Sequence, residues 1–201
     1  MLLWDVDTQV DFLSPQGRLY VPGAELLIPK LARLTACAHT RHWPIISSAC
    51  AHLPGDPELE TYGPHCMVGT PGQQKIPATI LPDHYVVPNR LIDSFPAKSY
   101  AQIIIEKQAF DVFTNPNTDA VLHQFGRSQG IVLYGVVTEI CVAAAAYGLL
   151  DRGHRVALVR DAIRALDTEK AADFVEDFLH SGGQLVTTDD VTCPGTSSLA
   201  A

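Results

Sequence analysis

The stretch IVLYGVVTEICV, residues 131–142, decides the fold. A short apolar, β-branched run over Ile131–Val136 predicts a strand buried on both faces, as in a parallel sheet. The residues that follow predict a helix over Glu139–Leu150, rich in small side chains. A strand that passes directly into a helix is half of a βαβ unit, and here Cys141 stands at the junction.

The same alternation continues on both sides of this stretch. Short apolar strands that alternate with helices predict a parallel sheet covered on both faces, with right-handed crossovers. We therefore expect a Rossmann-like, three-layer α/β/α sandwich with a mostly parallel central sheet. The other strands are expected at Leu2–Val6, Pro44–Ala49, Tyr85–Val87, Ala101–Glu106, Arg155–Val159 and Gln184–Thr187, and the other helices at Ala24–His42, Asn117–Arg127 and Thr168–His180. Pro29 interrupts the pattern of the first of these helices, so that helix could begin near Pro29.

The chain has 201 residues, which favours a single domain over residues 1–201. The tail at 193–201 is small and polar, and we expect it to be frayed. A long stretch rich in proline and glycine, Leu53–Lys98, lies between predicted strands. Such segments in compact domains are usually functional, so we expect this one to contribute to a binding site.

The net charge of −8 argues against a nucleic acid or an anionic membrane as a partner. No run of apolar residues reaches the length of a membrane-spanning helix, and the beginning of the sequence does not resemble a signal peptide. We therefore expect a cytoplasmic protein. The five cysteines are odd in number and irregularly spaced, which predicts reduced thiols rather than a disulfide framework.

Three reactive side chains, Asp7, Lys107 and Cys141, stand at or just past the carboxyl ends of predicted strands. Ligands of open α/β sheets bind at this edge. A thiol in the first turn of a helix feels the positive end of the helix dipole, which favours the thiolate. Asp7 could then accept the thiol proton and Lys107 could stabilise the charge. The alternative is three unconnected residues: a buried cysteine, a strand-end aspartate and a solvated lysine.

Four motifs, in order, resemble the isochorismatase-like cysteine hydrolases, which include nicotinamidases and N-carbamoyl and ureido amidases. The resemblance runs from Leu2 to about Asp190 and is consistent with the expected sandwich. The motifs are Asp7–Phe12 (DTQVDF), His65–Gly72 (HCMVGTPG), Lys107 followed by Phe110 and Phe113, and Gly135–Val142 (GVVTEICV).

The resemblance implies a catalytic triad and a reaction. Cys141 would attack an amide or ureido carbonyl, Asp7 would move the proton, and Lys107 would complete the triad. A cis peptide between Val136 and Val137 would aim the N–H of Val137, with that of Cys141, at the oxyanion. An amine would leave, and water would hydrolyse the thioester. Isochorismatases that cleave a vinyl ether lack this cysteine, so Cys141 favours a small amide as substrate.

A metal site is the point at which the sequence departs from the family. Nicotinamidases carry a D-x-H pair and a later histidine, whereas this chain has Cys50, His52 and His65. These three could hold Zn²⁺ or another divalent metal with one open position, or the histidines could simply form hydrogen bonds in the pocket wall. Asp56 is a further candidate ligand, with a solvated turn residue as its alternative.

Phe12, Tyr62 and Arg90 are the candidate substrate-binding residues. The two rings match aromatic positions of the family, with ordinary packing as the alternative. Arg90 lies in a long loop over residues 75–101 and could clamp a carboxylate, with a surface arginine in a salt bridge as the alternative. Family members are commonly dimers or tetramers, so we expect a homodimer or homotetramer.

Two rival functions stay open at this point. One is a non-enzymatic ligand-binding or interaction protein that keeps the fold. The other is a thiol redox protein, although no second cysteine lies near Cys141 in the sequence.

Overall fold

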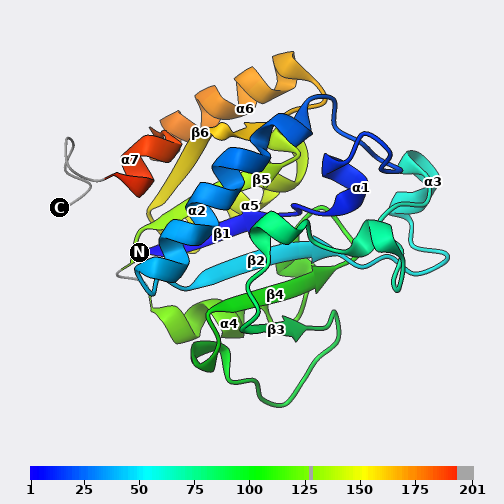
Figure 1. Ribbon diagram of the computed structural model, residues 1–201, viewed down its shortest axis with the longest axis horizontal. Coiled ribbons are helices and arrows are strands. Elements are labelled where there is room, and N and C mark those ends of the chain that lie inside the picture. The colour runs from blue at the N-terminus through cyan, green and yellow to red at the C-terminus, as the bar shows by residue number, and fades with distance from the viewer. Residues whose placement is uncertain (127–128, 194–201) are drawn as a thin grey trace.

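The computed structural model describes residues 1–126 and 129–193. In this part of the chain, seven strands form a single sheet in the order β3-β4-β2-β1-β5-β6-β7 (Figure 1). Every neighbouring pair is parallel, which confirms the predicted sheet and makes it wholly rather than mostly parallel. The strands are β1 (Leu2–Val6), β2 (Ile45–Cys50), β3 (His84–Val87), β4 (Gln102–Lys107), β5 (Ile131–Val136), β6 (Val156–Arg164) and β7 (Gln184–Val186).

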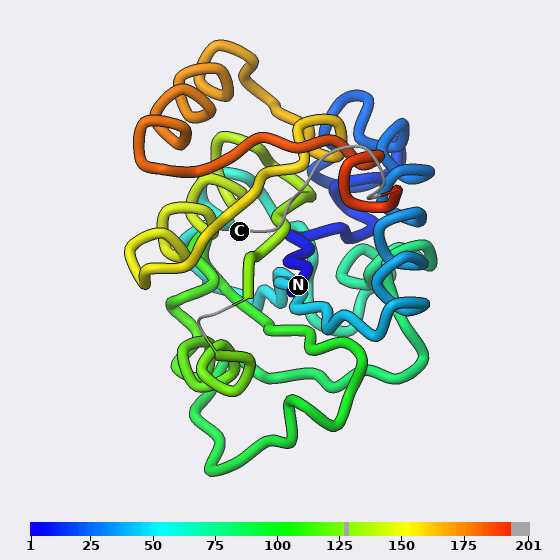
Figure 2. Tube along the Cα trace, turned by 90° about the vertical axis from the view of Figure 1, so that its left-hand side faces the viewer, coloured from blue at the N-terminus to red at the C-terminus, as the bar shows by residue number. Residues whose placement is uncertain are grey.

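Helices cover both faces, as expected for a three-layer sandwich. Side chains of successive strand residues point to opposite faces, so Trp4 and Leu133 pack on one side while Leu3 and Val132 pack on the other. Figure 2 shows the two helical layers on either side of the sheet. The first layer holds α4 (Thr118–Phe125), α5 (Ala143–Asp151) and α6 (Thr168–His180), and the second holds α1 (Val10–Leu13), α2 (Ile28–Thr40) and α7 (Thr188–Thr192).

In the described part of the chain, no helix is both long enough and apolar enough to cross a lipid bilayer.

Several boundaries differ from those predicted. Helix α2 begins at Ile28 with Pro29 in its first turn, and the preceding residues, Ala24–Leu27, form a 3₁₀ turn. Strand β6 continues to Arg164, because pairing with β5 resumes beyond an irregularity in register. Helix α4 ends at Phe125, and the predicted end at Arg127 lies outside the described residues. Of the tail predicted to be frayed, only Cys193 is described.

The segment from 75 to 101 is not one continuous loop, because it contains the short strand that was predicted at Tyr85–Val87. Part of it is β3, the edge strand paired with β4. Lys75, at its start, is buried and forms an ion pair with Asp5 at 2.7 Å. The segment therefore mainly extends and anchors the sheet.

The junction after β5 also differs. A single π-helical turn, Thr138–Val142, precedes α5, which begins at Ala143. Cys141 therefore lies in this turn and not in the first turn of a regular helix. π-helical turns are rare and occur frequently at functional sites.

Gly135 lets β5 lie close to β1 at the site edge. Its φ of +125° is a backbone conformation that residues with a side chain rarely adopt, and an added Cβ would lie 2.1 Å from the carbonyl oxygen of Val6.

We predict that Gly135→Ala lowers the free energy of unfolding by about 3 kcal/mol or more, measured by urea denaturation. Gly130→Ala is the matched control, since a Cβ there meets nothing within 4 Å. Equal, small effects of the two changes would contradict this reading.

Candidate active site

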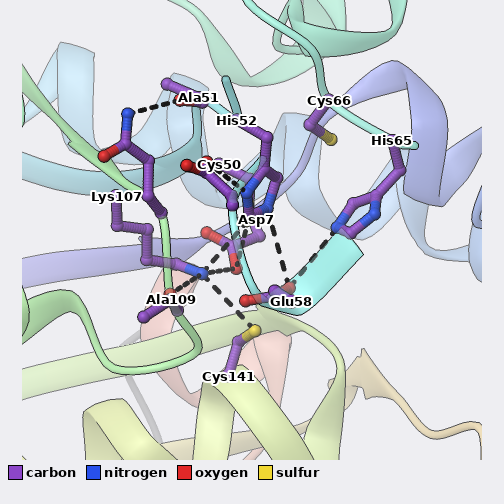
Figure 3. Close-up of polar contacts among 12 residues, drawn as sticks. Asp7, Cys50, Ala51, His52, Glu58, His65, Cys66, Lys107, Ala109 and Cys141 are labelled. Carbon is purple, nitrogen blue, oxygen red and sulfur yellow. Dashed lines mark hydrogen bonds and ion pairs between the residues drawn. The ribbon is translucent and has the colours of Figure 1, made fainter. Parts of the chain in front are cut away.

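Lys107 is the centre of the candidate active site (Figure 3). It ends β4, is fully buried, and its Nζ lies 2.9 Å from Oδ2 of Asp7. The ammonium also donates to the carbonyl oxygen of Ala109 at 3.0 Å, to Sγ of Cys50 at 3.2 Å and to Sγ of Cys141 at 3.5 Å. Burial opposes the charge, but Asp7 and the thiols outweigh it and raise the pKa of Lys107 well above its ordinary value. Lys107 is therefore not the solvated lysine of the alternative reading.

Asp7 follows β1 and lies between β2 and β5. Its φ of +50° is unusual for a residue with a side chain. One carboxylate oxygen, Oδ1, accepts from the hydroxyl of Ser48 at 2.6 Å, while Oδ2 faces Lys107. The carboxylate is thereby fixed beside both thiols, with Sγ of Cys50 3.8 Å from Oδ2. This is a suitable position for a group that accepts a proton from a thiol.

Cys141 lies at the bottom of the cluster in Figure 3, with its sulfur directed at Lys107. Burial raises the pKa of the Cys141 thiol well above its ordinary value, and Asp7 and Cys50 raise it further, while Lys107 acts in the opposite direction. Burial therefore acts against the thiolate that the position of Cys141 before a helix favoured. The neutral thiol is thereby favoured over the thiolate, and the Asp7 carboxylate contacts the same sulfur.

The peptide bond between Val136 and Val137 is cis. This is the position to which the family resemblance assigned it. The two residues connect β5 to the turn that carries Cys141.

Two buried histidines lie on the other side of Cys50. Nδ1 of His52 faces Oδ2 of Asp56 at 3.2 Å, and Nδ1 of His65 donates to the carbonyl oxygen of Gly63 at 2.9 Å. Because both partners are acceptors, Nδ1 donates in each contact, and Nε2 of each ring is the atom that faces Glu58. Burial lowers the pKa of His52, although nearby Glu58 acts against this. Histidines whose Nδ1 donates to a carboxylate or a carbonyl oxygen are typical of metal ligands.

Glu58, in α3 (Glu58–Tyr62), is the site residue that the sequence analysis missed. Its Oε1 lies 3.6 Å from Nε2 of His52 and 3.4 Å from Nε2 of His65 (Figure 3). One ligand atom each from Cys50, His52 and His65 lies within 4.8 Å of the others, so the predicted set does converge. Nothing in the sequence around Glu58 distinguished it from the other acidic residues of the stretch Leu53–Lys98.

Asp56 lies in a turn on the Nδ1 side of the His52 ring. Its carboxylate accepts from the backbone N–H of Leu53 at 2.8 Å and contacts Nδ1 of His52. It therefore stands behind His52 and orients the ring.

The candidate substrate-binding residues divide into two groups. Phe12 is buried edge-on against His65, with ring centroids 5.6 Å apart, and Tyr62 packs edge-on against Phe110 at the same separation. Arg90 is exposed, and its carbonyl oxygen accepts from the side chain of Asn117. In the described part of the chain, no contact joins its guanidinium to the cluster around Lys107.

Two further polar residues hold this site together. Gln9 donates to the carbonyl oxygens of Cys50 at 2.8 Å and Gln73 at 2.6 Å, and it accepts from the N–H of Cys50. Asp11 accepts from the N–H of Cys66 at 2.7 Å, which fixes the residue next to His65. Hydrogen bonds from the chain just after Asp7 thus connect the segment that carries His65 to the sheet.

The fold and the site together define an α/β protein with a buried carboxylate, ammonium and thiol at the carboxyl edge of a parallel sheet. This is an arrangement suited to nucleophilic hydrolysis.

Comparison with known proteins places this chain in a family. The family model described as the isochorismatase domain matches residues 87–190, just over half of the chain. The chain therefore belongs to the isochorismatase family and is a hydrolase of that family with its α/β fold.

Three similar proteins show which kinds of enzyme this chain resembles. A nicotinamidase from Acinetobacter baylyi is 28% identical over an alignment of 207 residues that covers 92% of this chain and 92% of the relative. N-carbamoylsarcosine amidase from Thermoplasma acidophilum is 25% identical with a TM-score of 0.74, covering 94% of this chain and 96% of that one. Pyrazinamidase from Pyrococcus horikoshii, in complex with zinc, is 26% identical with a TM-score of 0.77, covering 92% and 98%.

The raised pKa of Cys141 gives a testable pH dependence. The thiolate fraction grows as the pH rises towards a raised pKa, so the rate of alkylation of Cys141 by iodoacetamide should still be increasing above pH 9. Peptide mapping after timed labelling measures the rate, with Cys141→Ser to identify the peptide. A rate that reaches its plateau below pH 8 would mean that the resting group is a thiolate.

Proposed function

We propose that this protein hydrolyses the C–N bond of a small amide or ureido compound, with Cys141 as nucleophile, Asp7 as general base and acid, and Lys107 as the charged partner of both. The observation that carries the proposal is the buried ammonium of Lys107, which lies 2.9 Å from the carboxylate and 3.5 Å from the thiol. The amidase relatives support the choice of bond, since a nicotinamidase and an N-carbamoylsarcosine amidase both match over more than nine-tenths of the chain.

The reaction follows from these positions. The proton of Cys141 passes to Asp7 as sulfur attacks the carbonyl carbon, so a C–S bond forms and the carbonyl oxygen becomes an oxyanion. Collapse of this intermediate breaks the C–N bond, and the amine leaves with the proton from Asp7. Water, deprotonated by Asp7, then attacks the thioester, and the acid and the thiol are released. Lys107 keeps the carboxylate and sulfur in place through both halves.

The oxyanion needs donors near Cys141. Following the family resemblance, we assign this role to the backbone N–H groups of Val137 and Cys141, at the two ends of the short connection after β5. Donors placed in advance, in a site with little water, stabilise developing charge strongly. Phe12 and Tyr62 are proposed as aromatic walls for the substrate, and Arg90 stays a prediction as a clamp for a carboxylate.

Ammonia release tests the proposed triad. The panel holds nicotinamide, pyrazinamide, N-carbamoyl amino acids and ureido acids. Cys141→Ala, Asp7→Asn and Lys107→Met should each lower kcat/KM for the best substrate by about 10³-fold or more, because the three groups act as a unit. Cys37→Ala, which removes a thiol on α2, is the matched control and should retain activity. Full activity in Cys141→Ala would overturn the mechanism. If the native protein released no ammonia from any compound of the panel, a non-enzymatic role would be favoured.

The histidine cluster fits a divalent metal. Among the described residues, the buried atoms without a hydrogen-bond partner include Nε2 of His52, Nε2 of His65 and Oε2 of Glu58. Unpaired buried acceptors that face one another are costly unless a cation lies among them. We propose that these residues, with Cys50 as a thiolate ligand, hold Zn²⁺ or another divalent metal. The metal would act as a Lewis acid that anchors a lone pair of the substrate.

Metal analysis by mass spectrometry tests this site. We predict about one zinc per chain after dialysis against zinc and then metal-free buffer, and at least a tenfold weaker affinity in Glu58→Gln. Glu60→Gln is the matched control, since Glu60 is an exposed acid on the same short helix and should not affect binding. The same affinity in both variants would exclude Glu58 as a ligand, and absence of bound zinc in the native protein would exclude the zinc site.

The expected assembly is a proposal of the same kind. We propose that the protein forms a homodimer or a homotetramer. Light scattering after gel filtration measures the mass of the assembly directly.

A further inference from the structure

The surface between α2 and α7 holds two cysteines that the proposed mechanism does not use. The two helices lie side by side (Figures 1 and 2), although their sequences are more than 140 residues apart. Arg33 of α2 donates to Oδ1 of Asp189 at 2.7 Å and to Oγ1 of Thr192 at 3.0 Å. Arg41, the residue directly after α2, donates to the carbonyl oxygen of Thr192 at 3.5 Å. Both arginines therefore hold the end of α7.

Cys37 lies between these arginines. It is four residues from each, so all three side chains share one face of α2. Cys193 directly follows Thr192, and its Sγ lies 3.8 Å from Oγ1 of that residue. Since both arginines contact Thr192, the face that carries Cys37 is the face that Cys193 reaches.

The two thiols differ in exposure. Cys37 is half-buried and Cys193 is exposed. Burial raises the pKa of Cys37, the charge of Arg41 opposes this, and the proximity of Cys193 raises it further. One thiol is thus open to reagents in solution, and the other is shielded beside it.

We propose that Cys37 and Cys193 are a redox-sensitive pair that forms a disulfide and so fastens the end of α7 to α2. The proposal is independent of the proposed function, because neither cysteine belongs to the cluster around Lys107.

A low-molecular-weight disulfide such as oxidised glutathione is the oxidant. The thiolate of Cys193 attacks one sulfur of glutathione disulfide, which forms a mixed disulfide and releases one glutathione thiolate. The thiol of Cys37 then loses its proton to solvent and attacks the Cys193 sulfur, which forms the Cys37–Cys193 bond and releases the second glutathione. Two protein thiols are oxidised to one disulfide and one glutathione disulfide is reduced to two thiols.

The bond would join distant parts of the chain. It closes a loop of about 155 residues, and loops of this length restrict the unfolded chain most. The oxidised protein should therefore resist unfolding more than the reduced protein.

The test uses the full chain incubated with oxidised glutathione. We expect the count of free thiols to fall by two, peptide mapping to find Cys37 joined to Cys193, and Tm to rise by about 5 °C or more, reversed by dithiothreitol. Cys37→Ser and Cys193→Ser should each abolish both the linked peptide and the rise in Tm. Cys66→Ser, which removes a buried thiol elsewhere, should keep both.

Two results would overturn the proposal. Glutathione that stays attached to Cys193 while Cys37 remains free would show that the sulfurs cannot meet. A disulfide between two chains through Cys193 would show that the exposed thiol has no partner within its own chain.

Discussion

The buried charge of Lys107 is the constraint on which the site depends. A lone ammonium away from water costs several kcal/mol, so it persists only where acceptors surround it. Here the acceptors are the carboxylate of Asp7, a carbonyl oxygen and two sulfurs, supplied by residues at or just past the ends of four different strands. The four strands must end at the same level for these groups to meet, and a parallel sheet in register provides this. The site therefore depends on the fold: the ammonium of Lys107 keeps the thiol and the carboxylate close together, and the parallel strands keep Lys107 and its acceptors in place.

The residues that follow Asp7 connect this cluster to the rest of the site through hydrogen bonds. Gln9 connects β2 to the chain at Gln73, and Asp11 fixes the backbone next to His65. The two histidines are then oriented from behind by a carboxylate and a carbonyl oxygen, so their free nitrogens face Glu58. A metal bound there would be positioned relative to Cys141 through a few short polar links. In the proposed function, the cluster around Lys107 would supply the nucleophile and the proton transfer, and the histidine cluster would anchor the substrate.

The sequence was sufficient for the parts of this arrangement that rest on local patterns. Buried apolar runs predicted every strand of the sheet, and residues at strand ends led to Asp7, Lys107 and Cys141. Cys50, His52 and His65 followed from spacing together with the resemblance to a family. Glu58 was missed because it lies in a five-residue helix inside a stretch with no periodicity. The raised pKa of Cys141, the thiol of Cys50 beside it and the proximity of Cys37 to Cys193 depend on burial and on contacts between distant segments, which one sequence does not display.

A covalent intermediate on Cys141 is the central claim of this account. The most direct measurement is intact-protein mass spectrometry, followed by peptide mapping, on a reaction with the best amide substrate quenched in acid within milliseconds. The account predicts an added mass equal to the acyl part of the substrate, without its amine, on the peptide that contains Cys141. Turnover with no such adduct under conditions in which hydrolysis of the thioester limits the rate, or an adduct on another residue, would contradict it.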